Sequence, residues 1–495
     1  LEGCVGATSS ARAGIRPPSY TRGGDSDDDV GKPARYGARR RQLGSDVVYD
    51  ASMPALDFYS SNDFDSLDGN DYTFTIGVGA EINSSSTFDF KNTIHVVNEG
   101  SITTYDNTSF FRGGLENDVT GTITVKGAGN GGTSRLSVTD SLINRGTIEL
   151  AEPDATNSDI ELLVGGDSKL ENFGTITTSQ SGGASGSTFL IAGQLTNYGT
   201  LNANHDLDLN SATTTDNHMN RGTINIASGA VLAVGSGDTF TNDETGTITG
   251  AGTFDVSDAI DGALINNGVI DIAGNTVATV DGLQVIGDLT ASDTSEIIFD
   301  VGNNGSGVSD TLTVTGQMTM NGTLQAKFIS GSAPAVGDVF NVVSFAAATA
   351  GSYFDTVVGL EGDGTTLLDL DIDTSFGLVS LTAVANALSP TSGTDILNGS
   401  SAADYAYGGD GDDVLYGDGG EDLLLGGAGN DRISISDNDF SYIDGGSGTD
   451  TLLAYNGLDM TSVRNDSIDG FERLELGFGA LTLDGEDVIS ITDGI

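Results

Sequence analysis

The aspartates near the C-terminal end of this chain recur at a spacing that could build metal sites. Five follow one another at intervals of nine residues and a sixth comes after a slip of one residue: Asp395, Asp404, Asp413, Asp422, Asp431 and Asp450. Calcium is a hard cation that takes about six to eight oxygen ligands, which a carboxylate and the backbone carbonyls of a tight turn can supply. The row therefore predicts a series of Ca2+ sites.

Most of these aspartates close turns rich in glycine, which tolerates the positive φ angles that aim carbonyl oxygens inward. Two nine-residue units make one turn of a coil, so Asp404 should face Asp422 and Asp413 should face Asp431. The remaining candidate ligands are turn residues whose oxygens would complete the sites: Gly408, Asp410, Gly417, Gly419, Gly426, Ala428, Gly445 and Ser447.

An apolar position follows the aspartate position of each unit by two residues. It holds Leu397, Ala406, Leu415, Leu424, Ile433, Tyr442 and Leu452, with Asp444 taken as the extra residue. Short strands with such a row predict a parallel β-roll, in which these side chains fill a narrow core between two sheets. The alternative is an acidic, glycine-rich disordered tail, but disorder gives no reason for an apolar register.

Residues 390–453 resemble the RTX (hemolysin-type calcium-binding repeat) family through units such as GGDGDDVLY and GGAGNDRIS. The resemblance implies a bacterial protein that is exported by type I secretion and folds when it meets extracellular calcium. Three units depart from the pattern: GSSAADYAY lacks most of its glycines, PTSGTDILN keeps only Gly393 and Asp395, and ISDNDFSYI lacks the aspartate at its sixth position. We therefore expect roughly two to four filled sites rather than a full ladder.

A second, longer repeat runs from about residue 72 to 282, in phrases such as LINRGTI, LENFGTI and LTNYGTL. Its asparagines are Asn98, Asn117, Asn144, Asn172, Asn197, Asn220, Asn242 and Asn266. A period in the low twenties, rich in Thr, Ile, Val and Gly, predicts a right-handed parallel β-helix with one rung per repeat. The asparagines should occupy a turn and hydrogen-bond to their own copies on neighbouring rungs.

Two apolar ladders should point into this β-helix. One comprises Ile102, Ile123, Ile148, Ile176, Leu201, Ile224, Ile248 and Ile270, and the other Val96, Leu115, Leu142, Leu170, Leu195, Phe240 and Leu264, with His218 as its only polar member. The phrases resemble the passenger domains of autotransporter and filamentous-type adhesins. That resemblance implies the fold more strongly than any activity, and a purely structural stalk is an equally good interpretation.

The fold class is therefore all-β, a parallel β-helix followed by a calcium-binding β-roll. We predict five segments: a basic N-terminal tail over 1–45 that is disordered or processed, β-helix rungs over 46–282, and an irregular β-helix end over 283–385. The roll follows over 386–453, and a β-rich segment over 454–495 that could be truncated.

Composition restricts the classes of function. The formal net charge is −52, which argues against nucleic-acid binding and against adsorption to an anionic membrane. It suits a secreted protein bathed in divalent cations, which would relieve the repulsion between its own charges. A single cysteine, Cys4, excludes an intramolecular disulfide framework, and no apolar run is long enough for a transmembrane helix.

The chain contains none of the common catalytic motifs that we sought, such as G-x-S-x-G, a phosphate loop or H-E-x-x-H. His95, His205 and His218 fall on different rungs, so they predict no zinc cluster. A β-helix polysaccharide lyase or epimerase remains an alternative, because such enzymes place a base near a cation on one face. Its candidate residues are His205, Asp206, Asp208 and Arg221.

The sequence thus predicts a secreted bacterial cell-surface or matrix protein, adhesin-like, in which calcium acts structurally. Its expected partners are calcium ions and carbohydrate or other cell-surface components, with no nucleic acid. The alternatives are a structural filament, polymerised through the β-helix ends or the N-terminal tail, and the β-helix enzyme. Ordered polymers would distinguish the filament from the adhesin.

Overall fold

The computed structural model describes residues 40–43, 46–52, 56–58, 62–66, 71–84, 87–105, 108–127, 132–153, 158–165, 168–181, 188–210, 216–272, 281–303, 307–329, 332–388, 391–464 and 467–482. Most of the predicted tail, with Cys4, lies outside these residues, as does the end of the C-terminal segment. Strands dominate the described residues, where one short 3-10 helix, η1 (Met460–Ser462), also occurs. No helix in that part of the chain has the length and apolar character needed to cross a membrane. The all-β prediction is confirmed.

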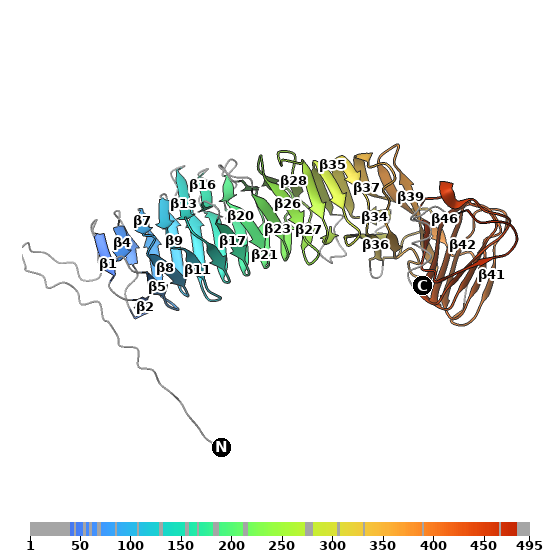
Figure 1. Cartoon of the computed structure of the whole chain (residues 1–495), viewed down its shortest axis with the longest axis horizontal. Helices are drawn as coiled ribbons and strands as arrows, with labels where there is room; N and C mark the ends of the chain where they lie inside the picture. The colour runs from blue at the N-terminus through green and yellow to red at the C-terminus, as the bar shows by residue number, and fades with distance from the viewer. Residues whose placement is uncertain are drawn as a thin grey trace, which may run out of the picture.

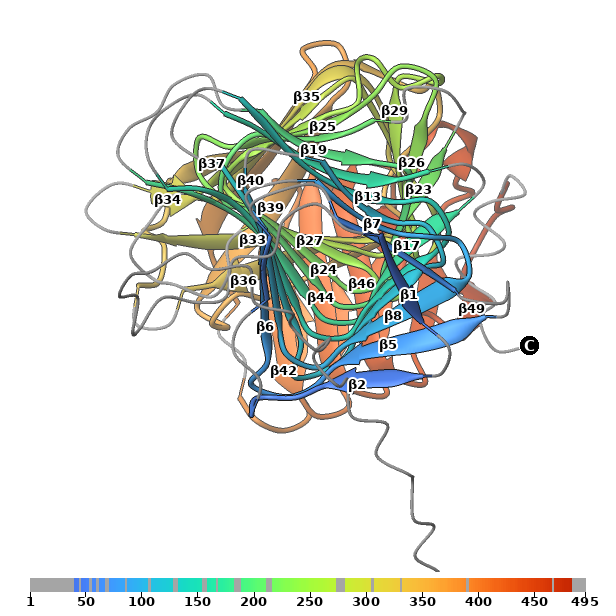
Figure 2. The same cartoon turned by 90° about the vertical axis from the view of Figure 1, so that its left-hand side faces the viewer.

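The first three quarters of the described chain form a parallel β-solenoid, which makes a long rod (Figure 1). Each strand pairs with the strand three places later in the chain, so one turn comprises three strands and the rod has three faces. Viewed along the rod, the strands of successive turns overlie one another (Figure 2). The predicted β-helix is therefore present.

Face A contains β1 (Arg40–Leu43), β4 (Asn62–Ser66), β7 (Phe88–Phe90), β10 (Thr108–Phe111), β13 (Thr133–Val138), β16 (Asp159–Val164), β19 (Phe189–Ala192), β22 (Leu207–Leu209), β25 (Val231–Val234), β28 (Thr253–Asp255) and β31 (Gly282–Ile286). Face B contains β2 (Val47–Tyr49), β5 (Tyr72–Ile76), β8 (Ile94–Asn98), β11 (Leu115–Asn117), β14 (Leu142–Asn144), β17 (Lys169–Asn172), β20 (Gln194–Asn197), β23 (Asn217–Asn220), β26 (Thr239–Asn242), β29 (Ala263–Asn266) and β32 (Asp288–Ala291).

Face C contains β3 (Leu56–Phe58), β6 (Glu81–Ser84), β9 (Ser101–Tyr105), β12 (Thr122–Lys126), β15 (Thr147–Glu152), β18 (Thr175–Gln180), β21 (Thr200–Ala203), β24 (Thr223–Ile226), β27 (Thr247–Gly250), β30 (Val269–Asp271), β33 (Glu296–Asn303), β36 (Thr323–Phe328) and β38 (Thr356–Val358). Faces A and B merge on the long strand β35 (Thr311–Thr319), and β34 (Gly307–Ser309) pairs antiparallel with β33.

The interior of the rod consists of columns of like residues. On face C the predicted isoleucine ladder is in register from Ile102 to Ile270, and its side chains are fully buried. The second predicted ladder runs along face B, also buried. Alternation of inward apolar and outward polar residues along each strand explains why both ladders could be found from the sequence.

An asparagine ladder stands beside the apolar column of face B. All eight predicted asparagines are completely buried. The Nδ2 atom of each donates to the Oδ1 atom of the next at 2.7–2.8 Å, without interruption from Asn98 to Asn266. A primary amide carries both a donor and an acceptor, so a stack of amides satisfies itself. The predicted hydrogen bonding between copies is confirmed.

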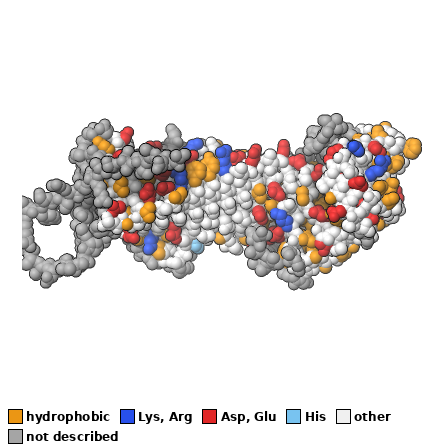
Figure 3. Space-filling view, turned by 90° about the horizontal axis from the view of Figure 1, so that it is seen from below, with side chains coloured by type: hydrophobic (Ala, Val, Ile, Leu, Met, Phe, Trp, Pro, Cys, Tyr) orange, Lys and Arg blue, Asp and Glu red, His pale blue; other side chains and the backbone are white. Residues whose placement is uncertain are grey.

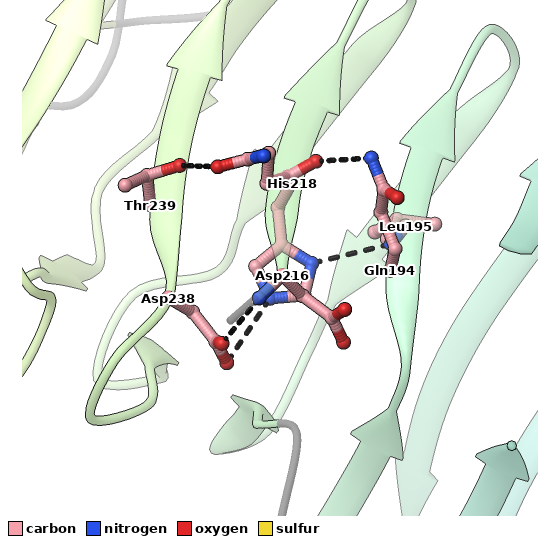
Figure 4. A network of polar contacts seen from close by, with 7 residues as sticks. Gln194, Leu195, Asp216, His218, Asp238 and Thr239 are labelled. Carbon is pink, nitrogen blue, oxygen red and sulfur yellow. Dashed lines mark hydrogen bonds and ion pairs between the residues drawn. The ribbon is translucent and has the colours of Figure 1, made fainter. Parts of the chain in front are cut away.

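His218 is the polar member of the face B ladder, and it is buried with a network of its own (Figure 4). Its Nδ1 atom accepts a hydrogen bond from the backbone N–H of Leu195 at 3.2 Å. The ring proton of a neutral imidazole therefore lies on Nε2, which is 3.6 Å from Oδ2 of Asp238. Oδ1 of Asp238 in turn accepts from the backbone N–H of Asp216 at 2.8 Å. At this position of the face B ladder, a hydrogen-bonded histidine side chain thus takes the place of an apolar one.

The rod changes character near its C-terminal end. Strand β37 (Val339–Ala348) continues the parallel stack, but β40 (Leu378–Ala385) pairs antiparallel with it and with β39 (Thr366–Asp373). This irregular closure falls within the segment 283–385, where an irregular end was predicted. Beyond it lies a smaller two-sheet unit at the tip of the rod (Figure 1).

That smaller unit is a parallel β-roll. The first roll sheet contains β41 (Ile396–Asn398), β43 (Val414–Tyr416), β45 (Arg432–Ile435), β47 (Thr451–Ala454) and β49 (Arg473–Leu476). The second roll sheet contains β42 (Tyr405–Asp410), β44 (Asp422–Gly429), β46 (Phe440–Gly448) and β48 (Ile468–Asp469). Strands β48 and β49 extend both sheets past Leu453, the predicted end of the roll.

The predicted apolar row fills the core between these sheets, with one correction. Leu397, Ala406, Leu415, Leu424, Ile433 and Leu452 lie in that core, but the sixth strand, β46, contributes Ile443 instead of Tyr442. The register slips between Asp422 and Leu423, which pair with Phe440 and Tyr442 respectively. The extra residue is therefore Ser441 and not Asp444. Because a shift of one residue reverses the direction of every side chain, Tyr442 points out of the roll.

The asparagine ladder can be tested in the middle of the rod. Substituting Asn172→Ala leaves Oδ1 of Asn197 without its amide donor in a buried site. We expect the free energy of unfolding to fall by about 2 kcal/mol, measured by urea denaturation of the full chain. Asn225→Ala, on the outward side of β24, is the matched control and should change it by less than about 0.5 kcal/mol. Equal effects of the two substitutions would contradict a stabilising role of the ladder.

Candidate calcium centres

The roll arranges the predicted aspartates in two columns. Asp395, Asp413, Asp431 and Asp450 immediately precede strands of the first roll sheet and form the first column. Asp404 and Asp422 lie at the start of β42 and β44 and form the second column. Residues eighteen or nineteen apart in sequence therefore become neighbours on successive turns, which is the pairing that the sequence predicts.

After the first member of each column, one carboxylate oxygen of every aspartate accepts a hydrogen bond from the turn before it. The backbone N–H of Asp395 donates to Oδ1 of Asp413, and that of Asp413 donates to Oδ1 of Asp431, both at 2.7 Å. Asp450 accepts from Asp431 at 2.6 Å in the same way. In the second column, Asp404 donates to Oδ1 of Asp422 at 3.0 Å. These bonds hold each carboxylate in one orientation.

The other oxygen of three carboxylates has no hydrogen-bond partner. Among the described residues, Oδ2 of Asp413, Asp431 and Asp450 is buried without one, and these three residues are at most 1% exposed. A buried anionic oxygen without a partner is costly, because its hydration is lost and nothing replaces it. The structure therefore leaves three places where a cation would supply the missing interaction.

Glycine leaves space at these oxygens. A Cβ atom added to Gly408 would lie 2.6 Å from Oδ2 of Asp413 and 2.5 Å from the carbonyl oxygen of Gly426. One at Gly426 would lie 2.6 Å from Oδ2 of Asp431 and would also meet the carbonyl oxygen of Gly445. Neither Gly408 nor Gly426 has a positive φ angle, so space rather than backbone conformation requires glycine. Carboxylate and carbonyl oxygens of this kind are the ligands that calcium prefers.

The first aspartate of each column is already satisfied. Oδ2 of Asp395 accepts from the backbone N–H and the hydroxyl of Thr391, at 2.6 and 2.9 Å. Oδ2 of Asp404 accepts from the backbone N–H of Ser400 at 2.5 Å. These two predicted ligands thus close the first turn with hydrogen bonds, whereas Asp413, Asp431 and Asp450 leave an oxygen open.

Burial shifts the carboxyl groups toward their protonated forms. The pKa of Asp422 is raised to about 7 and the pKa values of Asp431 and Asp450 to about 6, first by burial and then by neighbouring acidic side chains. The pKa of Asp413 is also raised, first by burial. The hydrogen bonds from backbone N–H groups oppose these shifts. In the absence of a cation, burial in the folded roll therefore makes these carboxyl groups easier to protonate than they are in water.

The other predicted ligands were expected in turns, but Asp410, Ala428 and Ser447 lie within the strands β42, β44 and β46, and their roles as ligands remain predictions. Asp410 is exposed at the end of β42, whereas the carbonyl oxygen of Ala428 already accepts a hydrogen bond from Gly411 N–H at 2.7 Å. Gly417 faces Oδ2 of Asp422 as Gly408 faces that of Asp413. In the described part of the chain no three His, Cys, Asp or Glu side chains converge on one metal position, so a calcium centre here would need backbone carbonyls beside the carboxylate oxygen.

Two acidic residues near the columns were missed in the sequence. Oε2 of Glu472 accepts from the backbone N–H of Asp450 at 2.7 Å and so continues the first column beyond the repeats. Asp444, treated only as an extra residue, is half-buried: its Oδ1 accepts from Gly446 N–H at 2.8 Å, and burial, followed by Asp469, raises its pKa to about 7. Neither residue stands at a nine-residue interval, so periodicity could not reveal them.

The candidate catalytic residues of the β-helix make contacts typical of structural positions. Arg221 donates through Nε to Oδ2 of Asp243 at 2.6 Å and lies over the ring of Tyr198. Oδ1 of Asp206 accepts from Val231 N–H at 2.9 Å, and the ring of His205 stacks on Phe189. Asp208 is near Asp206, and burial followed by Asp206 raises its pKa. These contacts supply no base paired with a cation.

The space at Gly408 provides a direct test of the first column. Gly408→Ala places a methyl group against Oδ2 of Asp413 and the carbonyl oxygen of Gly426, so these two oxygens must move apart to admit it. We expect calcium affinity to fall by about tenfold or more, measured by isothermal titration calorimetry. Gly393→Ala is the matched control, because a Cβ there meets nothing within 4 Å. An unchanged affinity in Gly408→Ala would exclude this space as a calcium site.

The raised pKa values predict how pH affects the calcium-free roll. The usual carboxyl pKa of 3.8 rises to about 6 at Asp431 and about 7 at Asp422. The resulting stabilisation is complete below the unfolded value and is lost as the pH rises through about 6 to 7. Calorimetry in calcium-free buffer should therefore show the roll melting at a higher temperature at pH 5 than at pH 8.

Asp431→Asn retains the acceptor for Asp413 N–H and removes one titrating group. It should raise the melting temperature of the calcium-free roll at pH 8 and weaken its response to calcium. A roll that melts at a lower temperature at pH 5 than at pH 8 would contradict this account.

Comparison with known proteins agrees with the geometry. The family model of the RTX calcium-binding nonapeptide repeat (4 copies) matches residues 390–424 and 398–433, the segment that contains both columns up to Asp431. Neither a curated protein nor a solved structure matches the chain. The predicted resemblance is thereby confirmed: this chain carries RTX calcium-binding nonapeptide repeats, which follow a parallel β-solenoid.

Proposed function

We propose that this is a secreted bacterial surface or matrix protein in which calcium acts structurally to stabilise the roll. The observation that supports this most directly is the set of buried, unpartnered Oδ2 atoms of Asp413, Asp431 and Asp450 beside glycine turns. Extracellular calcium modules bind in the range of about 0.1–1 mM. Sites of that strength would stay empty in a cytosol and fill outside the cell, where folding of the roll would follow.

The rod supports a role in adhesion. The outward column beside the isoleucine ladder of face C is threonine on six successive turns: Thr122, Thr147, Thr175, Thr200, Thr223 and Thr247. Stacked strands place these hydroxyl groups about 4.8 Å apart. On the side shown in Figure 3, uncharged polar groups and backbone dominate the middle of the rod. Such a surface offers hydrogen bonds to carbohydrate, the ligand class that we propose.

An extended monomer is favoured over an end-to-end filament. Stacking of solenoids requires open sheet edges at both ends, but the roll lies against the C-terminal end of this one, and Tyr442 hydrogen-bonds to its last face C strand. Electron microscopy and sedimentation in calcium should therefore show single rods. Ordered polymers would support the filament instead.

The structural role of calcium can be tested on the full chain by circular dichroism and calorimetry during a calcium titration. We expect a separate thermal transition of the roll that moves up by about 5 °C or more near millimolar calcium, and that chelation reverses. The double substitution Asp413→Asn and Asp431→Asn should abolish the shift, whereas Asp255→Asn in the solenoid should preserve it. A roll transition insensitive to calcium would reject the proposal.

A further inference from the structure

The second roll sheet has two buried faces. Leu424 and Ile443 point into the core of the roll. Leu423, Leu425 and Tyr442 point the other way and belong to the same apolar cluster as the solenoid interior. Because neighbouring residues of a strand face opposite sides, strands β44 and β46 each contribute to both cores. The roll is therefore packed onto the rod.

Tyr442 covers the end of face C. Strand β38 is the last strand of that sheet, so its outer edge would expose backbone hydrogen-bonding groups. The hydroxyl of Tyr442 accepts from the N–H of Val357 at 3.3 Å and lies 3.4 Å from the carbonyl oxygen of Val357 and from Oδ2 of Asp469. A side chain of the roll thus satisfies the edge strand of the solenoid.

Asn386 forms a second connection at the junction. Its Nδ2 atom donates to the carbonyl oxygen of Gly364 at 2.9 Å, in the loop before β39. The same side chain lies 3.4 Å from both the N–H and the carbonyl oxygen of Tyr407, in the roll strand β42. Polar bonds therefore reach from the roll to the rod at two separate places.

The strands that dock the roll are also the strands that lead into its carboxylate turns. Asp422 directly precedes Leu423 in β44, and β46 runs from Tyr442 into the glycine turn that Asp450 closes. We propose that calcium binding by the two columns controls a removable cap: the ordered roll covers the solenoid end, and the calcium-free roll releases it. This inference rests on the proposed binding of calcium and adds its coupling to the rod.

Hydrogen exchange of the full chain, read by mass spectrometry, tests this coupling. With calcium, the amides of β38 and β39 should be protected together with those of the roll. In chelator at pH 8, we expect both segments to exchange about tenfold faster or more, while the asparagine-ladder strands β17–β24 keep their rates. Such a pattern would show that release is confined to the capped end.

Tyr442→Phe separates docking from binding. It keeps the aromatic ring in the apolar cluster and removes only the hydroxyl that bonds Val357. We expect an unchanged calcium affinity by calorimetry, protected roll amides, and at least about fivefold faster exchange at β38. Tyr416→Phe, on the first roll sheet, is the matched control and should leave β38 unchanged.

The outcomes distinguish the two proposals. Calcium binding that protects the roll while β38 exchanges at the same rate with and without the ion would overturn the cap and leave the proposed function intact. Absence of calcium binding by calorimetry, with no protection of the roll, would overturn both. Calcium-dependent protection of β38 that Tyr442→Phe loses and Tyr416→Phe retains would establish the coupling.

Discussion

Parallel stacking places each residue of this protein against its counterpart on the next turn, and the structure depends on what such a column can tolerate. Apolar columns bury their own surface, as Ile148 on Ile176 does. Asparagine columns also close on themselves, because an amide offers both a donor and an acceptor. A carboxylate offers only acceptors. In a column of aspartates, one oxygen of each carboxylate accepts a hydrogen bond from a backbone N–H of the neighbouring turn. The second oxygen has no donor.

This difference divides the molecule into two regions with different requirements. In the ladder from Asn98 to Asn266, each side-chain amide hydrogen-bonds to the next, so the ladder needs no group from outside the protein. The aspartate column of the roll is incomplete at Asp413, Asp431 and Asp450, and burial raises the pKa of each of these carboxyls. A proton or a cation must therefore compensate for burial. In a chain with a net charge of −52, a divalent cation at these carboxylates would also reduce the repulsion between acidic groups.

The same stacking creates the problem of how a solenoid ends, because its last strand exposes unpaired backbone groups. Here the antiparallel pair β39 and β40 closes one side, and the roll covers the edge of β38 through Tyr442. The junction therefore joins two different regions. The hydrogen bonds of the solenoid are satisfied by protein atoms, whereas we propose that the carboxylates of the roll are satisfied by calcium. The stability of the junction would then follow the ionic environment, while the middle of the rod would not.

Periodicity in the sequence determined the columns: the isoleucine, asparagine and aspartate ladders could all be predicted because a residue that stacks on its own copies must recur at the period of the fold. Tertiary structure alone decided the exceptions. The bulge falls at Ser441, so Ile443 rather than Tyr442 enters the roll core, and Glu472 joins the aspartate column without any repeat around it. The docking of the roll on the rod could not be predicted from the sequence either, because contacts between distant segments do not recur at a regular spacing. They arise from shape and from the satisfaction of backbone groups at an edge, which only the folded chain brings together.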